Sequence, residues 1–476
     1  MSRSNLTKNK YKDVFIGLGN YFVLFGLIIF SYLTYNSSSY YNIWAEFISI
    51  LSILLLIYQI IILRMRQYRI ISFQFVFTIL SFVFLFGQIW LIGFGREEAI
   101  FWGVIFRYSD ELLYRASLFS LCYSQAILIG FLFKSKMKIK KKSFLSKISK
   151  DKMSKYMYSA GVVLLIISIP FRLYMDIYSL LIVRMLGGYQ GIATPVGPMK
   201  DIAILTIPSI ILLLASQYKS KRTNTIIAVV TIFYLIFFMM ITGDRRYYVT
   251  ALISIVFVFI ELYTPKLRFR TIIKYGIAGS LGLNFLSLLR QTRRYSISIG
   301  EFISAYFTEL IAMNPIVETL SEFGLTFMTV VFAQKLVPNI IPYQLGFSFY
   351  GAIPSLLPIG WLVGDFFKDV SVARALNTAE GYPMGSSLPA ELYANFGWFG
   401  ILGAIFFGIV LSRIFLLNDS YNTPKEFLVA RYYATFYILI NFVRASTIEM
   451  FRQGIIVYFV PTFTIYLLWS LSKKST

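Results

Sequence analysis

The residues most suited to chemistry lie at positions 385–400, GSSLPAELYANFGWFG, directly before a long apolar run. This stretch holds one carboxylate, Glu391, and the chain contains no histidine. Because histidine is absent, a carboxylate is the available general base for a hydroxyl group. We therefore expect Glu391 to be catalytic, with Tyr393 and Asn395 contacting an acceptor or its sugar. The alternative is that Glu391 only complements a helix dipole or pairs with an arginine.

Arginines form a second group of candidates. The turn Thr242-Gly243-Asp244-Arg245-Arg246 joins two apolar segments, and LLRQTRRYS (288–296) closes another. A guanidinium keeps its charge and binds phosphate oxygens in a bidentate fashion, so these clusters predict an anionic ligand. The expected diphosphate-binding residues are Arg245, Arg246, Arg290, Arg294 and Arg374. Arg444 and Arg452 are expected at the acceptor or sugar, with ion pairing as an equal alternative.

Other carboxylates rank behind Glu391 as the base. Asp244 is the second choice, and Glu380 and Asp365 are more distant candidates. The single cysteine, Cys122, excludes a disulfide framework and a thiolate metal site. No compact acidic cluster is visible in the sequence either. We therefore predict no metal and no cofactor.

The composition indicates which elements must position these residues. Hydrophobic residues make up 57% of the 476, charged residues 14%, and the mean hydropathy is +0.69. A soluble domain carries about 25% charged residues. Apolar segments long enough to cross a bilayer recur along the chain. We predict an all-α polytopic membrane protein with about 12 transmembrane helices (12–14), near 13–35, 43–63, 70–94, 112–133, 156–176, 199–216, 225–242, 247–263, 272–290, 397–416, 427–446 and 453–472.

The distribution of lysine and arginine predicts that both termini are cytoplasmic. With this orientation the inner segments hold 20 Lys and 8 Arg, and the remainder of the chain holds 3 Lys and 14 Arg. The net charge of +23 is thus mainly a topology signal, and no nucleic-acid-binding motif accompanies it. The arginine excess on the outer side is not explained by topology. It favours an anionic ligand held at the outer leaflet.

We expect three regions: a membrane region with nine spans (1–290), a large extracytoplasmic loop (291–396), and a second membrane region with three spans (397–476). A structureless loop of that length would be unusual. The loop contains helical and proline-punctuated patterns, which predict short helices over a site at the outer leaflet. Additional spans near 323–337 and 347–363 remain open.

Two segments carry a resemblance to a known family. AIPSLLPIGWLVGDFFKDV (352–370) followed by GSSLPAELYANFGWFGILGAIFFGIVLS (385–412) resembles the signature region of bacterial oligosaccharide repeat-unit polymerases, the Wzy-type O-antigen and capsule polymerases. MMITGDRRYYVTAL (239–252) is similar to a threonine-glycine-x-arginine turn shared with O-antigen ligases. By this resemblance Glu391, Tyr393, Asn395 and Gly397 match the late-helix motif, and Arg245 matches the arginine of the turn.

The resemblance implies a glycosyltransferase with a GT-C-like core in the bacterial plasma membrane. Donor and acceptor would both be oligosaccharides linked to undecaprenyl diphosphate, and the growing chain would move en bloc to a new unit. It also implies membrane lipid, a chain-length regulator and a flippase as partners, and no nucleic acid. A lipid-linked oligosaccharide flippase and an O-antigen ligase are the alternatives. A flippase favours charges midway through its spans, and the ligases resemble one another in a loop histidine that this chain lacks.

Overall fold

The computed structural model describes residues 3–100, 103–133, 148–186, 198–242, 245–263, 315–351, 353, 372–381, 385–415 and 424–474. Every regular element within these ranges is a helix. Ten helical segments of this described part are long and apolar enough to cross a membrane. The prediction of an all-α polytopic membrane protein is therefore confirmed.

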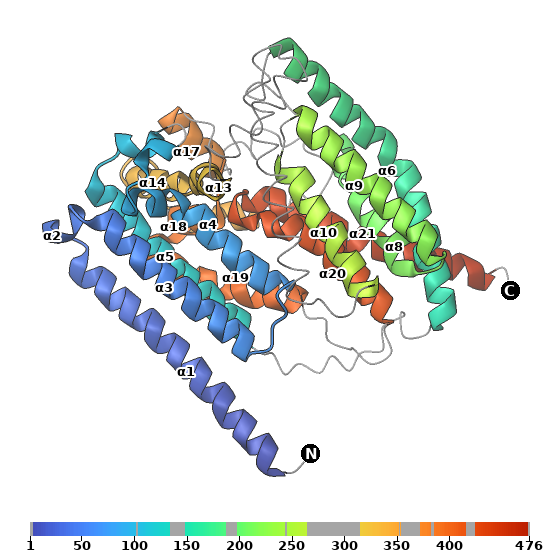
Figure 1. Cartoon of the computed structure of the whole chain (residues 1–476), viewed down its shortest axis with the longest axis horizontal. Helices are drawn as coiled ribbons and strands as arrows, with labels where there is room; N and C mark the ends of the chain where they lie inside the picture. The colour runs from blue at the N-terminus through green and yellow to red at the C-terminus, as the bar shows by residue number, and fades with distance from the viewer. Residues whose placement is uncertain are drawn as a thin grey trace.

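The long helices form two groups (Figure 1). The first contains α1 (Arg3–Thr34), α3 (Trp44–Met65), α4 (Phe73–Gly93), α5 (Asp110–Leu132) and α19 (Gly400–Ile414), with the short α2 (Ser38–Tyr41). The second contains α6 (Lys150–Leu186), α7 (Pro198–Ala203), α8 (Thr206–Ser216), α9 (Lys221–Thr242), α10 (Arg245–Tyr263), α20 (Lys425–Leu439) and α21 (Thr447–Lys474). The groups meet where the 3-10 turn η7 (Ile440–Val443), between α20 and α21, contacts α4 and α18 (Leu388–Phe396).

Helix α5 is the centre of the first group, because nearly all of its residues are buried. It contacts α1, α3, α4 and α19. Gly130 of α5 faces Gly408 of α19 so closely that a Cβ added at Gly130 would lie 2.6 Å from the Gly408 Cα. Small residues permit this backbone approach, and in membranes such packing replaces the hydrophobic drive that joins helices in water.

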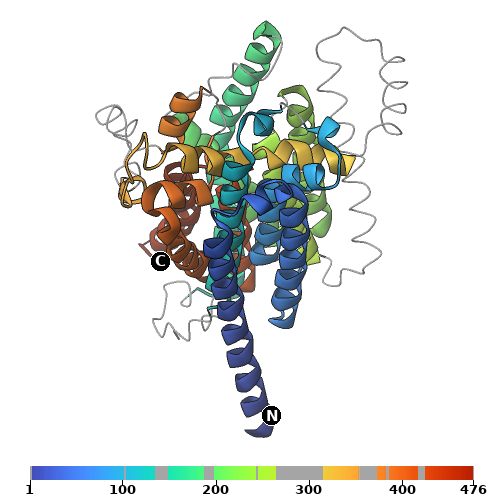
Figure 2. The same ribbon diagram turned by 90° about the vertical axis from the view of Figure 1, so that its left-hand side faces the viewer.

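Short helices cover one end of the bundle. They are α13 (Pro315–Gly324), α14 (Phe327–Leu336), α15 (Phe347–Tyr350) and α17 (Val372–Glu380), together with the 3-10 turns η1 (Glu97–Ala99) and η2 (Val104–Arg107). Figure 2 shows α13 and α14 lying across the long helices, near the end opposite the N-terminus. The segment Ile316–Leu336 is apolar enough to be a span. This segment nevertheless consists of two short helices, α13 and α14, and short helices are what we expected within 291–396.

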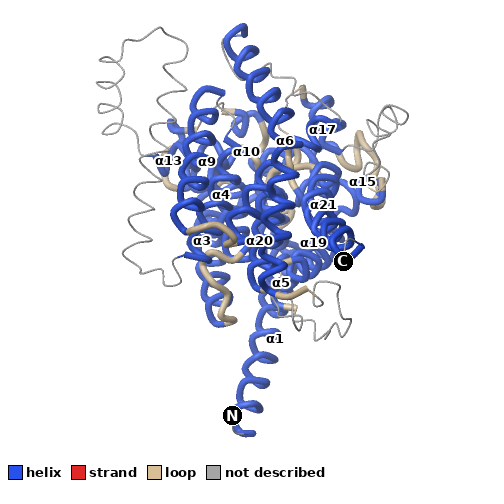
Figure 3. The backbone as a smooth tube through the Cα atoms, turned by 90° about the vertical axis from the view of Figure 1, so that its right-hand side faces the viewer, coloured by secondary structure: helices blue, strands red, loops and turns tan. Residues whose placement is uncertain are grey.

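The helix boundaries follow most of the predicted spans, and the described chain runs from helix to helix without a strand (Figure 3). The span predicted at 397–416 differs, because its helical segment begins earlier and reads Leu388–Ile414 with a break between α18 and α19. The span predicted at 427–446 consists of α20, which has 15 residues, and η7. The span predicted at 272–290 lies outside the described residues.

Candidate active site

Helix α18 carries the late motif, and its start is specified locally. Ser387 is the N-cap, and its hydroxyl accepts a hydrogen bond from the Ala390 N–H at 3.3 Å. Pro389 lies in the first turn, where its missing N–H has no intrahelical partner to lose. Gly397, with φ +56°, ends the helix and separates it from α19. Glu391 therefore lies in the first turn of α18, whereas the sequence placed it in the loop just before the span predicted at 397–416.

The Glu391 carboxylate is buried, with 2% of the residue exposed. Its Oε1 accepts hydrogen bonds from the Thr447 backbone N–H at 3.1 Å and from the Ser386 hydroxyl at 3.2 Å. Thr447 is the first residue of α21, so the carboxylate meets the positive end of that helix. No described donor makes a hydrogen bond to the second oxygen, Oε2, although the Thr447 hydroxyl lies beside the carboxylate. One oxygen is thus fixed in place, and the other has capacity to accept a proton.

Asn395, one turn after Glu391, holds the neighbouring loop. Its Nδ2 donates to the Ser348 hydroxyl at 2.8 Å and to the Glu391 carbonyl at 2.7 Å. Its Oδ1 accepts from the Gly346 N–H at 2.9 Å. Gly346 has φ +90°, a left-handed conformation that suits glycine. The asparagine of the motif therefore fastens α15 and the loop before it to α18.

Tyr393 and Gly397 complete the motif. Tyr393 is 6% exposed, and its ring meets the edge of Phe119 of α5 at a centroid distance of 5.1 Å. A Cβ added at Gly397 would lie 2.9 Å from the Tyr343 hydroxyl oxygen, and the positive φ there adds a second constraint. These contacts explain both residues by packing, and they leave the expected sugar contact of Tyr393 as a prediction.

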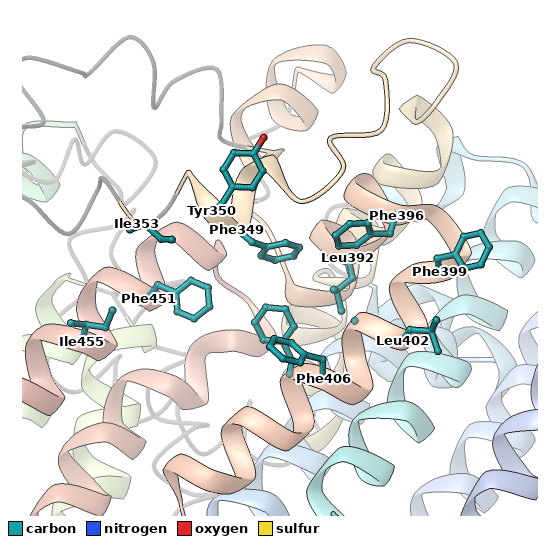
Figure 4. A pocket seen from close by; sticks show the side chains of 12 residues that line it. Phe349, Tyr350, Ile353, Leu392, Phe396, Phe399, Leu402, Phe406, Phe451 and Ile455 are labelled. Atoms are coloured by element: carbon teal, nitrogen blue, oxygen red, sulfur yellow. The ribbon is translucent and has the colours of Figure 1, made fainter.

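An apolar groove of about 710 Å³ is lined in part by Leu392 and Phe396 of α18 (Figure 4), and Glu391 of the same helix is not among its lining residues. It runs between α19 and α21 under α15. Phe399, just before α19, and Leu402 and Phe406 of α19 are more than 60% exposed. The groove is thus open at the side. Its lining residues are Phe349, Tyr350, Ile353, Leu392, Phe396, Phe399, Leu402, Gly403, Phe406, Phe407, Phe451 and Ile455.

Two ion pairs fasten the first turns of α21 to α7. Arg452 donates through Nε to Asp201 at 3.0 Å, and its Nη2 contacts the same carboxylate. Glu449 accepts from Lys200 at 3.0 Å. The expected site residue Arg452 therefore has a carboxylate partner, which is the ion-pairing alternative that the sequence left open. Arg444 lies just after η7 and is half-buried.

Two other candidates lie on α17, which contacts α18. Arg374 is exposed. Glu380 ends the helix, accepts from the Tyr108 hydroxyl at 2.6 Å and pairs with Lys335 of α14 at 2.8 Å. Burial and the Glu380 carboxylate raise the pKa of Tyr108. Glu380 therefore joins the short helices of this end to each other.

The remaining predicted site residues fall where the structure gives less detail. Asp244, Arg290, Arg294 and Asp365 lie outside the described residues. Arg245 and Arg246 are the first two residues of α10, and only their backbone is described. The diphosphate site expected at these arginines remains a prediction.

Sequence reasoning missed a buried ion pair in α6. Arg172 and Asp176 pair across one turn of α6, and both are buried. Their neighbours are Tyr234 of α9 and Tyr247 and Tyr248 of α10. An available signal was the spacing of four residues between an arginine and an aspartate inside an apolar span, since such residues face each other on a helix and are rare in membranes.

The described residues include no group of three or more acidic, cysteine or histidine side chains placed to hold a metal ion. A carboxylate oxygen without a hydrogen-bond donor can accept a proton from a hydroxyl, and guanidinium groups can neutralise a phosphate. The site is therefore suited to reactions in which a hydroxyl attacks and an anion leaves.

Comparison with known proteins gives one finding. A family model described as O-antigen polysaccharide polymerase Wzy matches residues 19–475. No curated protein and no solved structure matches the chain significantly.

Proposed function

This chain belongs to the O-antigen polysaccharide polymerase Wzy family, and from that premise we propose how it transfers glycan at the outer face of the bacterial plasma membrane. The donor is a glycan chain on undecaprenyl diphosphate, and the acceptor is a single repeat unit on a second undecaprenyl diphosphate. The whole chain moves to the acceptor, so the polymer grows at its reducing end. Both termini are cytoplasmic, as the charge distribution indicates.

We assign the base to Glu391. A hydroxyl oxygen of the acceptor attacks the anomeric carbon of the donor sugar, and its proton passes to Glu391 Oε2. The bond between the anomeric carbon and the phosphate oxygen breaks, and its electron pair leaves with the lipid diphosphate. The observation that carries this assignment is the asymmetry of the carboxylate: Ser386 and the Thr447 N–H hold Oε1, whereas no described donor occupies Oε2.

The leaving diphosphate needs positive charge at the moment the bond breaks. We assign this to arginines, with Arg245 and Arg246 at the start of α10 as the first choice and Arg290, Arg294 and Arg374 beside them. Arginine cannot lose its charge at physiological pH, so it can fulfil the role that a metal ion has in other such transferases. We therefore propose a metal-independent enzyme, built on a membrane core similar to that of the GT-C glycosyltransferases.

We place the isoprenoid chain of one substrate in the apolar groove between α19 and α21. The groove shares α18 with the Glu391 carboxylate, because Leu392 and Phe396 line it while Glu391 contacts α21. Its exposed aromatic wall lies on a helical segment apolar enough to be in the bilayer. A lipid chain lying there would keep its diphosphate close to α18.

The glycan profile of a strain lacking this gene tests the function. We expect single repeat units on lipid in the deletion strain, a full ladder after complementation with the wild type, and single units again with Glu391→Gln. Glu98→Gln is the matched control, because Glu98 is exposed and pairs only loosely with Arg96 at 3.6 Å. Repeat units that accumulate on the cytoplasmic face would support a flippase instead. A normal ladder that fails to reach its final acceptor would support a ligase.

A further inference from the structure

Five residues of three helices form a buried polar group that the proposed reaction does not use. This α6–α10 cluster consists of Arg172, Asp176, Tyr234, Tyr247 and Tyr248. Arg172 Nε donates to Asp176 Oδ2 at 2.9 Å, and Arg172 Nη2 donates to the Tyr248 hydroxyl at 2.9 Å. The Tyr248 hydroxyl donates in turn to Asp176 Oδ1 at 2.8 Å. Tyr234 of α9 donates to the same carboxylate.

The ion pair of the cluster and Tyr248 are closed to solvent, and Tyr234 and Tyr247 are half-buried. Arg172 is 7% exposed and Asp176 is 1% exposed. The Arg172 guanidinium lies over the Tyr247 ring, 3.5 Å from its centroid. Ionisable groups at membrane depth are costly, and they are retained mainly where they serve function. A buried pair is weak evidence for stability, because apolar residues of the same volume often stabilise as well or better.

The position of the cluster in the chain suggests its role. Tyr247 and Tyr248 follow Arg245 and Arg246 directly, so the cluster binds the first turn of α10. Tyr248 reaches both members of the ion pair, and Tyr247 stacks on the guanidinium. Any displacement of this turn would break contacts to a buried charge. The backbone that carries the two arginines is thus fixed relative to α6.

We propose that Arg172, Asp176 and Tyr248 are positioning residues for the lipid diphosphate. They set the first turn of α10, and through it they place Arg245 and Arg246 for the phosphate oxygens. This inference rests on the proposed function, which assigns those two arginines to the diphosphate. Binding geometry is sensitive to small displacements, because a catalytic group 1 Å out of place can lose much of its effect. A cluster that only joined helices would not affect phosphate binding selectively.

The other end of α10 offers a matched control. The Tyr263 hydroxyl accepts from Asn224 of α9 at 2.6 Å, so it also joins α10 to a neighbouring helix through one hydroxyl. Tyr248→Phe and Tyr263→Phe therefore make the same chemical change on the same helix, 15 residues apart. The purified full chain in lipid nanodiscs would be assayed for transfer between lipid-linked repeat units. Inhibition by free undecaprenyl diphosphate and thermal unfolding would be measured in parallel.

For Tyr248→Phe we expect the KM for the donor and the inhibition constant for undecaprenyl diphosphate to rise together, by roughly five- to twenty-fold, as for a lost hydrogen bond to a charged group. Tyr263→Phe should change both constants by less than about two-fold. Its Tm should also decrease, because Asn224 loses the acceptor of its hydrogen bond. If Tyr248→Phe does not fold, Arg172→Lys addresses the same question, because it keeps the charge and loses the planar fork.

If Tyr248→Phe and Tyr263→Phe have the same KM and inhibition constant and only their Tm is lowered, the positioning role is overturned. The cluster would then only stabilise the packing of the helices. That result would leave the proposed function intact. A wild-type chain that neither transfers glycan nor responds to undecaprenyl diphosphate would instead overturn the proposed function. A loss of transfer with an unchanged inhibition constant would also contradict the inference, because phosphate binding would then be independent of the cluster.

Discussion

Two buried carboxylates, Asp176 and Glu391, differ in how their oxygens are used. Asp176 accepts from Arg172, Tyr234 and Tyr248, so both of its oxygens are occupied. Glu391 has one occupied oxygen and one to which no described donor makes a hydrogen bond. Both are almost fully buried. Burial alone therefore does not distinguish these two carboxylates, whereas their hydrogen-bond partners do.

The difference follows from the partners that the fold supplies. Asp176 has a guanidinium one turn away on its own helix, which neutralises its charge. Among the described residues, Glu391 accepts from the Ser386 hydroxyl and from the Thr447 N–H at the start of α21, and no ion pair joins its carboxylate to a cation. Such neutral donors orient a carboxylate without binding its charge as tightly as an arginine does. Asp176 is suited to holding helices in place, and Glu391 is suited to exchanging a proton.

The largest effect on polymer formation is expected from Glu391→Ala. It removes the base and also leaves the Thr447 N–H and the Ser386 hydroxyl without their acceptor, at a cost of about 1–3 kcal/mol in the free energy of unfolding. Glu391→Gln keeps an amide oxygen for both donors, so it should lose polymer while staying close to wild-type stability. Thermal unfolding and the glycan ladder would be compared for the two variants. Equal stability of the two variants would mean that the hydrogen bonds from the Thr447 N–H and the Ser386 hydroxyl to residue 391 do not stabilise the fold.

Asp176→Asn is expected to destabilise the chain by about 3–5 kcal/mol, because it leaves the buried Arg172 without its counter-charge. The variant that replaces both residues, Arg172→Met with Asp176→Leu, should recover much of this stability. Unfolding in detergent, followed by helical circular dichroism, measures both. An Asp176→Asn protein as stable as the wild type would mean that the two carboxylates do not differ as described.

Narrowing the groove should have an intermediate effect. Gly403 of α19 lines it, and a Cβ there would lie 2.7 Å from the Leu392 Cδ2, the end of a side chain that can move. Gly403→Leu is therefore expected to raise the KM for a long-chain lipid substrate several-fold with little change in kcat. Phe463→Leu is the control, because Phe463 is an exposed apolar residue of α21 that is absent from the groove lining. An unchanged KM for Gly403→Leu would contradict the proposal that the lipid chain of a substrate binds in the groove.

The smallest effect is expected from Ser386→Ala. It removes one of the two hydrogen bonds to Glu391 Oε1, and the Thr447 N–H still holds that oxygen. The transfer rate should decrease about three- to ten-fold, as for a net hydrogen bond of about 1 kcal/mol. Steady-state rates on lipid-linked repeat units measure this. A loss as large as that of Glu391→Gln would indicate that the serine itself takes part in the reaction.

The sequence predicted the helical membrane class because apolar segments and charge asymmetry are local features. It also identified the motif of Glu391 and Asn395. It could not predict their partners, since Thr447 and Ser348 lie 56 and 47 residues away along the chain. The same holds for the α6–α10 cluster, where Tyr248 lies 72 residues from Asp176. The early start of α18 was visible in principle, because Ser387 and Pro389 are typical of a helix N-terminus.

The most direct test of the account measures binding and transfer separately for Glu391→Gln. Purified wild-type and variant chains in nanodiscs would receive one lipid-linked repeat unit as donor and another as acceptor. We predict that the variant binds the donor with wild-type affinity and forms the two-unit product at least about 10²-fold more slowly, as for the loss of a general base. Product formation by Glu391→Gln at the wild-type rate would contradict the assignment of Glu391 Oε2 as the base.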